Sequence, residues 1–547
     1  MSRHSNTLED RGEFGDGVHI SGRGHQTFIA NQSEHQFRPE SYNQSVMSEF
    51  ESKEEAGEEE AYHVFTQRQK WKVVLMIGLA GLFSGLSSNI YFPSLDVISK
   101  DLNVSFKTVS LTITSYLVVQ GISPMFWGSL SDTVGRRPIY IYSFLVYIAA
   151  NIALSFSPNF AVLVVFRGLQ AAGSASTVSI GNGVIQDITP PAERGGFMSF
   201  YQAIRNFSIA VGPVAGGILA HVFGFRSIFI FLLILSSVTV LAIITFFPET
   251  LRSIAGNGSF RLTGIHQPLI SKITKEAPYM TDRDEGLGTP KVTLRTFYEP
   301  LLLFKEKDIL LSLVFGGTIY AIWSMVTSST TTLFKDAFHL NELLLGLAFL
   351  PNGLGTIVGS TIVGILMNKS YAKAEKEYKE RHNLPADYRF PKKDLPSDFP
   401  IEHTRLRHTK WIIVIFMLAT IGYGFSLAVP SLVARPGWIA IPLMFQFFIA
   451  ASSNAIFSIN QTLLADLCPG KGASSTAINN LVRCLMGSIG VAFIEEMIDD
   501  IGVSSTFLGL GLVTAVVAPL LIAQWYLGPA WRKHRMEKRM VDHGEGV

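Results

Sequence analysis

The sequence is poor in charge, because Lys, Arg, Asp and Glu make up only 16% of its 547 residues. A typical soluble chain has about 25%, and a soluble protein of this length would form several domains with charged surfaces. There are only two cysteines, Cys468 and Cys484, which excludes a disulfide framework as the architecture. The net charge of +2 gives no basis for expecting a nucleic-acid partner.

Catalytic and targeting signatures are also missing. The segment 469–475, PGKGASS, lacks the upstream glycine of a phosphate-binding loop, and no metal-ligand cluster or nucleophile motif is present. We therefore expect no enzyme, no cofactor and no bound metal. Residues 1–60 contain no apolar run, so we expect no cleavable signal peptide and an uncleaved first apolar segment.

The chain instead carries apolar segments of the length that crosses a membrane. About 20 residues span about 30 Å of hydrocarbon as a helix, and 48% of the residues are hydrophobic. We predict an all-α membrane protein with twelve transmembrane helices. The expected spans are residues 72–95, 108–130, 138–157, 160–185, 197–221, 225–247, 309–333, 342–367, 411–430, 437–464, 474–498 and 503–527.

The segments between the spans predict the organisation of the chain. Lys and Arg concentrate on one side when both tails lie in the cytosol, which predicts that orientation. The polar and acidic N-terminal tail is expected to be disordered. The expected parts are this tail (1–70), an N-terminal six-helix bundle (71–248), a cytosolic loop (249–308), a C-terminal six-helix bundle (309–527) with a cytosolic insertion (368–410), and a basic cytosolic C-tail (528–547).

The two halves resemble each other in sequence. Residues 187–212 align with residues 466–490 with one residue of gap, so spans 4 and 5 match spans 10 and 11. Such a parallel repeat of six spans forms two pseudo-symmetric bundles with the substrate between them. The aligned pairs are Asp187 with Asp466, Arg205 with Arg483, Gly212 with Gly490 and, twenty residues before the first pair, Arg167 with Gln446.

Three motifs resemble those of the major facilitator superfamily. The turn between spans 2 and 3, GSLSDTVGRR, is similar to its loop 2–3 signature, and span 4 and span 5 resemble its R-x-x-Q and G-P-x-x-G-G patterns. Span 1 and the FPET sequence after span 6 resemble the twelve-span drug:proton antiporter family. The long N-terminal tail and the Asn-Asn-x-x-Arg sequence of span 11 (Asn479, Asn480 and Arg483) resemble its fungal quinidine-resistance branch. The matching residues are Gly128, Leu130, Asp132, Gly135, Arg136, Arg137, Arg167, Gln170, Gly173, Gly212, Pro213, Gly216 and Gly217.

The turn between spans 2 and 3 is predicted to act as a latch. Asp132 is expected to pair with Arg136 and to lie against the positive N-terminal end of span 11, near Gly472 and Ala473. Asp187 is a second expected partner of the arginines. Such contacts would hold the two halves together on the cytosolic side. The alternative is that Arg136 and Arg137 only fix the topology.

Arg167 lies inside span 4, where a charge is costly and normally faces a cavity or a partner. The resemblance implies a role in proton coupling, with Gln170, Asn89 and Tyr91 as candidate partners. The alternative is an arginine that only braces spans 1 and 4. Gly212, Pro213, Gly216 and Gly217 predict close approach of span 5 to span 8 at a rocking joint, because small residues let helices approach.

A wide cavity with polar and aromatic side chains is predicted between the halves. Arg205 and Arg483 either extend to the membrane surface or line this cavity and contact an anion. The whole set favours a neutral or weakly cationic amphiphile. The cavity candidates are Asn89, Tyr116, Gln120, Gln202, Arg205, Tyr320, Trp323, Asn352, Gln446, Asn454, Asn460, Asn479, Asn480 and Arg483.

These features predict a secondary transporter that exports small organic compounds, such as drugs or amphiphilic or cationic metabolites, by proton antiport. The alternatives are a narrow-specificity exporter or facilitator of a polyamine, organic acid or amino acid, and a transport-inactive sensor or scaffold. The expected partners are the lipid bilayer, a small-molecule substrate and protons. We expect a monomer in the plasma membrane, with a vacuolar or other internal membrane as the alternative. The candidate proton groups are Asp132, Asp187, Glu495, Glu496 and Asp96.

Overall fold

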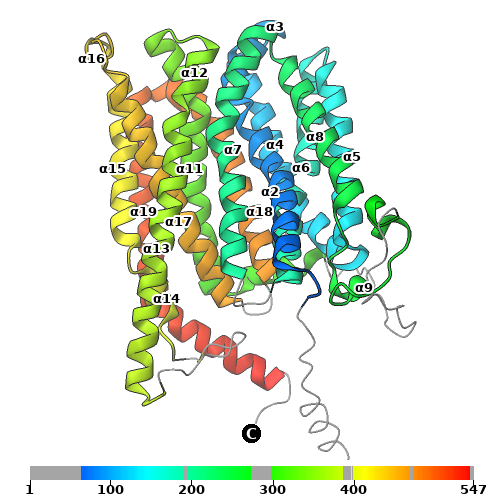
Figure 1. Ribbon diagram of the computed structural model, residues 1–547. Helices are drawn as coiled ribbons and strands as arrows, with labels where there is room; N and C mark the ends of the chain where they lie inside the picture. Colours follow the sequence, from blue (N-terminus) through cyan, green and yellow to red (C-terminus); the bar gives the residue numbers. More distant parts are fainter. Residues whose placement is uncertain are drawn as a thin grey trace, which may run out of the picture. The chain divides into compact units, whose positions relative to one another are not determined.

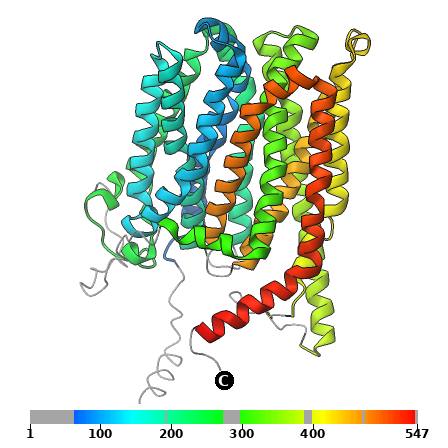
Figure 2. The same cartoon turned by 180° about the vertical axis from the view of Figure 1, so that it is seen from behind.

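The computed structural model describes residues 63–189, 194–272, 297–385, 396, 398–468 and 472–542, so the predicted tail before residue 63 lies outside it. Long helices stand side by side over this part of the chain (Figures 1 and 2). They correspond to the twelve predicted spans. These helices are α2 (Gln67–Asn89), α4 (Phe106–Val134), α5 (Arg136–Ser155), α6 (Phe160–Ile188), α7 (Arg194–Phe223), α8 (Arg226–Phe246), α11 (Lys307–Phe338), α13 (Leu350–Arg381), α15 (Thr409–Ala428), α17 (Ala440–Leu467), α18 (Gly472–Ile501) and α19 (Val503–Asp542).

Short helices lie at the two ends of this bundle (Figure 1). One end, called the outer end below, carries η1 (Phe92–Ser94), α3 (Leu95–Asp101), α12 (Glu342–Ala348) and α16 (Pro430–Val433). The opposite end, called the inner end, is the one predicted to face the cytosol. It carries α9 (Arg252–Ala255), η2 (Gly264–His266), η3 (Leu269–Lys272), η4 (Glu299–Lys305) and α14 (Ile401–Leu406).

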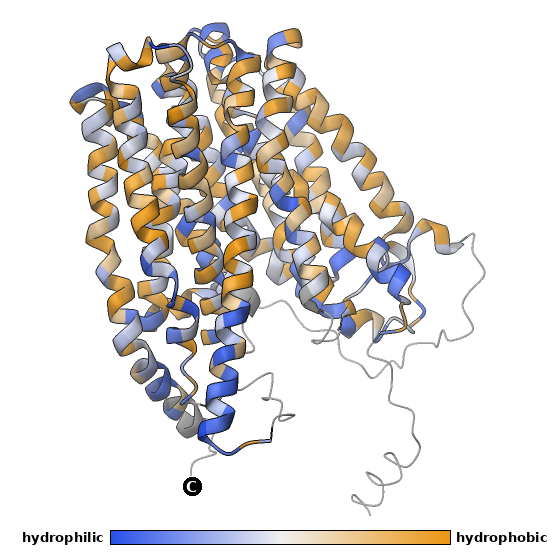
Figure 3. Cartoon of the chain, turned by 60° about the vertical axis from the view of Figure 1, so that its left-hand side comes forward, coloured by the Kyte–Doolittle hydropathy of each residue, from blue (hydrophilic) through white to orange (hydrophobic). Residues whose placement is uncertain are grey.

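Apolar residues run along the helices, and hydrophilic residues gather toward the lower end of the view in Figure 3. Large apolar side chains such as Leu241 and Val516 are exposed, as lipid-facing positions require. In the described chain, 11 helical segments are long and apolar enough to span a membrane. The remaining long helix is α18, whose charged residues include Arg483 and Glu495. It packs against α4 and α11, and so shields these charges from lipid.

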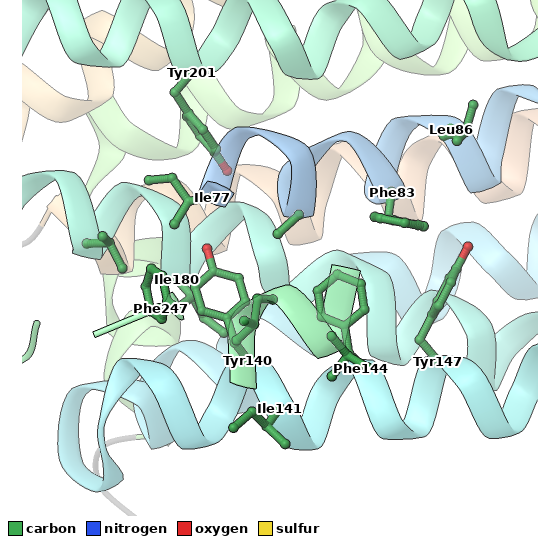
Figure 4. Close-up of a cluster of buried hydrophobic side chains, with 14 of the residues drawn as sticks. Ile77, Phe83, Leu86, Tyr140, Ile141, Phe144, Tyr147, Ile180, Tyr201 and Phe247 are labelled. Atoms are coloured by element: carbon green, nitrogen blue, oxygen red, sulfur yellow. The ribbon is translucent and has the colours of Figure 1, made fainter. Parts of the chain in front are cut away.

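The long helices form two groups, α2 to α8 and α11 to α19 (Figure 1). The halves meet mainly where α4 packs on α18 and where α7 packs on α12 and α13. The core of the first half joins α2, α5, α6 and α7 (Figure 4). Phe83 packs edge-on against Phe144 and Tyr147, with ring centroids 5.3 and 5.6 Å apart. Geometry of this kind adds stabilisation beyond area burial.

Two helices extend beyond the predicted membrane spans. Span 8 was expected to end at residue 367 and be followed by a loop, but α13 continues to Arg381. The extension carries ion pairs at i,i+4 spacing, which stabilise an exposed helix; they join Lys373 to Glu377, Lys376 to Glu380 and Lys379 to Glu375. Likewise, the basic tail predicted from residue 528 is helical, because α19 runs to Asp542.

The end of α19 is held by two buried ion pairs. Arg532 donates to Glu402 at 2.8 Å, and Arg535 donates to Asp308 at 2.7 Å and to the Leu467 carbonyl at 2.9 Å. Arg535 therefore ties the end of α19 to the start of α11 and the end of α17. Both arginines therefore contact buried protein groups.

We expect Arg535→Ala to lower the thermal stability of the purified protein, because Asp308 would lose its buried cation. Breaking a buried pair from one side costs about 3–5 kcal/mol. The measurement is the unfolding temperature in detergent, with Lys533→Ala as control, because Lys533 is exposed on the same helix. Equal unfolding temperatures for the two variants would contradict this role of Arg535.

His63 packs where the described chain begins, before α2. Its ring lies 4.1 Å from that of Phe65, and it is 6% exposed. Burial, followed by the charges of Arg252 and Lys70, lowers the pKa of His63 to about 4. Since the ordinary pKa is about 6.5, folding favours the neutral ring, so this packing is stable above pH 6.5 and weakens as the pH falls through 4.

We therefore expect the wild-type protein to lose stability relative to His63→Phe as the pH is lowered from about 6.5 to 4. The phenylalanine keeps an aromatic ring but does not titrate. The measurement is the difference in unfolding temperature between the two proteins at a series of pH values. A difference that does not change with pH would show that His63 does not contribute in this way.

Candidate transport site

The turn between α4 and α5 forms a buried ion network at the inner end. Gly135 has φ +120°, a conformation that favours glycine. The turn brings the Arg136 guanidinium to Asp132, and its Nε donates to Asp187 at 2.9 Å. Arg136 thus joins the ends of α4, α5 and α6, as the sequence predicted for Asp132 and Asp187.

Glu249, which follows α8, completes this network. Its buried carboxylate accepts from the backbone N–H of Arg136 at 2.8 Å and of Arg137 at 3.2 Å. It thereby satisfies unpaired donors at the N-terminus of α5 and complements the helix dipole. Arg137 donates in return to the Phe247 carbonyl at 2.8 Å. The predicted site did not include Glu249, although the FPET sequence that contains it was noted.

The contacts described for this network all lie in the first half of the chain. Asp132 is about half exposed, and the side chains of residues 469–474 lie outside the described part. The contact of Asp132 with Gly472 and Ala473 therefore remains a prediction, and so does a latch between the two halves. Gly183 leaves room for the Arg136 guanidinium, which a Cβ there would meet at 2.6 Å.

The second half repeats this ion pair. Arg405, on α14 before α15, donates to Asp466 at the end of α17 at 2.8 Å. Asp466 is the residue that the sequence repeat aligned with Asp187. The Arg405 guanidinium also lies over the Tyr371 ring, 4.9 Å from its centroid. Within the described chain, this pair lacks the second carboxylate that Asp132 supplies to Arg136 in the first half.

Arg167 lies at the centre of the first half and is 1% exposed. Its Nη1 donates to the Ser87 carbonyl at 3.1 Å and to Gln170 at 2.5 Å. Its guanidinium lies over the rings of Tyr91 and Tyr116, 4.1 and 4.4 Å from their centroids. The third predicted partner, Asn89, donates instead to the Gly85 carbonyl of its own helix. Nε of Arg167 has no hydrogen-bond partner in the described chain.

The repeat extends to the side chains around Arg167. In the first half, the Ser87 hydroxyl lies 2.6 Å from the Tyr147 hydroxyl, and Arg167 donates to the Ser87 carbonyl. In the second half, Thr330 lies 3.1 Å from the Tyr423 hydroxyl and accepts from Gln446 at 3.3 Å. Gln446 is therefore the neutral counterpart of Arg167.

Arg205 and Arg483 form a second pair of repeat-related positions, on α7 and α18. Arg483 donates to Asn480 at 2.9 Å and lies over the Tyr320 ring, 4.6 Å from its centroid. Arg205 has no side-chain hydrogen bond or ion pair within the described chain. Across the described residues, none of Arg167, Arg205 and Arg483 forms an ion pair with a carboxylate.

Most other predicted cavity residues make hydrogen bonds between helices. Asn480 donates to the Gln120 carbonyl at 2.9 Å and so links the two halves. No polar contact of the Gln202 side chain is found in the described part. The remaining bonds join Tyr116 to Ser174, Trp323 to Asn352, Asn454 to Thr356, Asn460 to Asn479, and Asn479 to Gln461.

The predicted joint between spans 5 and 8 is only partly present. Gly217 lies against α12, where a Cβ would meet Gly346 at 3.2 Å, and the Pro213 carbonyl also approaches Gly346. Gly212 and Gly216 instead face α2 at Asn89 and Ile90. On α13, Gly353 faces Ala210 of α7, whereas Gly355 and Gly359 face α17. Glycines four residues apart share a face, but those one residue apart do not.

Ion pairs connect the halves at the outer end. Asp96 pairs with Lys335, and Lys107 pairs with Asp499 at 2.9 Å. Nδ1 of His221 also lies within hydrogen-bond distance of Glu342, at 3.1 Å. The contacts between halves named above lie from Gln120 and Asn480 outward. The sequence identified Asp96 only as a candidate proton group.

Glu495 is the other candidate proton group that the structure places inside the bundle. It is 6% exposed on α18 and accepts a hydrogen bond from Thr332 at 3.4 Å. No ion pair of Glu495 is found in the described chain, whereas Asp187 and Asp96 are both paired with cations. Which group carries a proton stays a prediction.

In the described chain, two groups of long helices enclose buried arginines and amides, an arrangement that is typical of secondary membrane transporters. The sequence model of the Major Facilitator Superfamily matches residues 77–491. The chain belongs to this superfamily, and it is a transporter and not an enzyme.

Three comparisons define the similarity further. Citrate exporter 1 of Aspergillus niger is 45% identical over 492 residues, which cover 90% of this chain and 92% of the exporter. Quinidine resistance protein 1 of Saccharomyces cerevisiae is 29% identical over 478 residues, covering 84% and 83%. The structure of the human organic anion transporter MFSD10 matches with a TM-score of 0.53 at 15% identity, covers 83% of this chain and 99% of that chain, and shows the fold alone.

Proposed function

We propose that this chain exports citrate or a chemically similar polycarboxylate from the cytosol across the plasma membrane. The observation that carries the proposal is the set of three inward arginines, Arg167, Arg205 and Arg483, without a carboxylate partner in the described chain. A buried charge without a counter-ion is costly, and a bound carboxylate would supply one through charge-assisted hydrogen bonds. The 45% identity to a citrate exporter supports the same substrate class.

The predicted export of cationic drugs has less support. A cationic guest would meet three positive side chains and would gain no ion pair at Arg167, Arg205 or Arg483. The relative named for quinidine resistance is also more distant, at 29% identity. The predicted alternative, a narrow-specificity exporter of an organic acid, therefore replaces the drug exporter as the main hypothesis.

Export of an anion also changes the energetic argument for proton coupling. Moving one elementary charge across a membrane is worth about 2.3 kcal/mol per 100 mV. An inside-negative potential therefore drives a polycarboxylate outward without a proton in exchange. Proton antiport remains a prediction that the same experiment can test.

The proposal is tested by efflux of isotope-labelled citrate and of a fluorescent cationic dye from cells that express the chain. We expect citrate efflux and no dye efflux, and we expect Arg483→Gln to lose citrate efflux. Arg435→Gln is the matched control, since it removes an exposed arginine from the outer end. Dye efflux without citrate efflux would overturn the proposal. A protonophore that stops citrate efflux at a clamped membrane potential would support proton coupling.

A further inference from the structure

We propose that residues 264–271, which follow α8, anchor the first half in the membrane surface at its inner end. This segment, called the anchor below, contains η2 and most of η3. Its exposed side chains Ile265, Leu269 and Ile270 enter the boundary between the lipid headgroups and the acyl chains, where apolar side chains of surface segments bind. The partner is therefore the lipid bilayer itself, and the proposal does not depend on the substrate.

The anchor lies on the flank of the bundle. Figures 1 and 2 show the green segment after α8 beside the inner ends of the helices of the first half, on the side away from the second half. Within it, η2 packs against α5 and η3 packs against α8. The flank of a membrane-spanning bundle faces lipid. This part of the predicted cytosolic loop 249–308 therefore stands where the bilayer begins.

The anchor continues an apolar surface that already faces lipid. Ile265, Leu269 and Ile270 are 39%, 44% and 40% exposed, and Phe246, the last residue of α8, is 53% exposed. Single exposed apolar residues are common on protein surfaces, but apolar residues grouped in a patch mark an interaction site. Since the α8 part of this surface contacts lipid, lipid is the occupant that also covers the anchor.

The charge of this part of the chain suits the same partner. Residues 251–272 contain Arg252, Arg261 and Lys272 and no Asp or Glu. The inner end is predicted to face the cytosol, and the cytosolic leaflet carries anionic lipids that attract basic segments. By contrast, the exposed extension of α13 carries lysine–glutamate pairs, which suit a helix surrounded by water.

The anchor is held in place by residues of the turn between α4 and α5. The Arg137 guanidinium donates to the Ile265 carbonyl, and Nδ1 of His266 lies 3.2 Å from the Glu249 carboxylate. A Cβ at Gly135 would meet the His266 ring at 3.0 Å. Because Glu249 also accepts from the backbone at the start of α5, lipid contact at the anchor bears directly on the ion network of this turn.

The test measures how deep a fluorescent label at position 270 lies, in purified full-length protein placed in nanodiscs that contain phosphatidylserine. Ile270→Cys carries the label, and Cys468→Ala and Cys484→Ala remove the native buried thiols. One quencher is a lipid with a spin label near the headgroup end of its acyl chain, and the other is iodide in the water. Leu269→Cys is the second variant, in case the first does not fold.

Two further labelled positions serve as controls. Lys376→Cys places the label on the exposed extension of α13, and Leu241→Cys places it on the lipid-facing side of α8. We expect the spin-labelled lipid to quench Ile270→Cys at least about twofold more than Lys376→Cys, because the apolar face of a surface segment is buried about 5–10 Å into the headgroup boundary. We expect iodide to quench Lys376→Cys strongly, and Ile270→Cys and Leu241→Cys only weakly.

Quenching of both anchor variants by iodide and not by the lipid would overturn the proposal and would assign this surface to water or to a protein partner. Discs of neutral phosphatidylcholine test the basic charge separately. We expect lipid quenching at Ile270→Cys to fall about twofold in these discs. Equal quenching in the two kinds of disc would overturn the preference for anionic lipid. No substrate is present, so these outcomes are independent of the proposed function.

Discussion

Arg167→Gln should reduce citrate efflux about 100-fold while the protein still folds and reaches the membrane. Hydrogen bonds to a charged group contribute about 1.5–3 kcal/mol, and a factor of ten corresponds to about 1.4 kcal/mol. Glutamine keeps a donor for the Ser87 carbonyl but removes the positive charge and its contacts with the rings of Tyr91 and Tyr116. The loss would therefore report the charge of Arg167.

The repeat supplies the reason to expect a folded variant. Gln446 occupies the equivalent position in the second half, where it packs beside Thr330 and Tyr423 as Arg167 packs beside Ser87 and Tyr147. Glutamine is thus compatible with this packing. The matched control is Gln446→Leu, which removes a neutral amide, and we expect it to lower efflux less than about tenfold.

The measurement is labelled citrate efflux, normalised to the amount of protein at the cell surface. Efflux above half of the wild-type rate in Arg167→Gln would support the alternative that Arg167 only braces α2 and α6. Loss of surface protein would assign the effect to folding, and the control variant separates the two outcomes.

Asp187→Ala should destabilise the protein more than Asp466→Ala, although the repeat makes the two residues equivalent. The Arg136–Asp187 side chains are 8% and 12% exposed, whereas those of Arg405 and Asp466 are 12% and 22% exposed. Removing one partner of a buried pair costs about 3–5 kcal/mol, and an exposed pair contributes at most about 1 kcal/mol. We expect Asp187→Ala to lower the free energy of unfolding by about 3–5 kcal/mol, and Asp466→Ala to lower it by an amount between about 1 kcal/mol and that value.

The measurement is the unfolding temperature of each variant in the same detergent. Asp132→Asn is the control in the first half, because Asp132 contacts the same arginine but its side chain is 48% exposed. We expect this control to cost less than about 1 kcal/mol. A larger loss for Asp466→Ala than for Asp187→Ala would contradict this ranking and the burial argument behind it.

Much of the candidate site could be predicted from the sequence, because its motifs are local. The Gly135-Arg136-Arg137 turn and the repeat alignment led to the Arg136–Asp187 pair, which the structure contains. Glu249 and Glu402 were missed, because each is more than 100 residues from the group that it binds. The predicted preference for a neutral or cationic guest came from counting polar residues without knowing which charges are compensated.

The sequence by itself determined that the chain is an all-helical membrane protein, and it predicted the positions of the long helices and the repeat, because apolar length and motif spacing are properties of consecutive residues. The tertiary structure decided which charges have partners. Arg136, Arg405, Arg532 and Arg535 are paired with carboxylates from other elements, whereas Arg167, Arg205 and Arg483 are not. The electrostatic character of the predicted cavity depends on these distances between helices, and no local pattern in the chain specifies them.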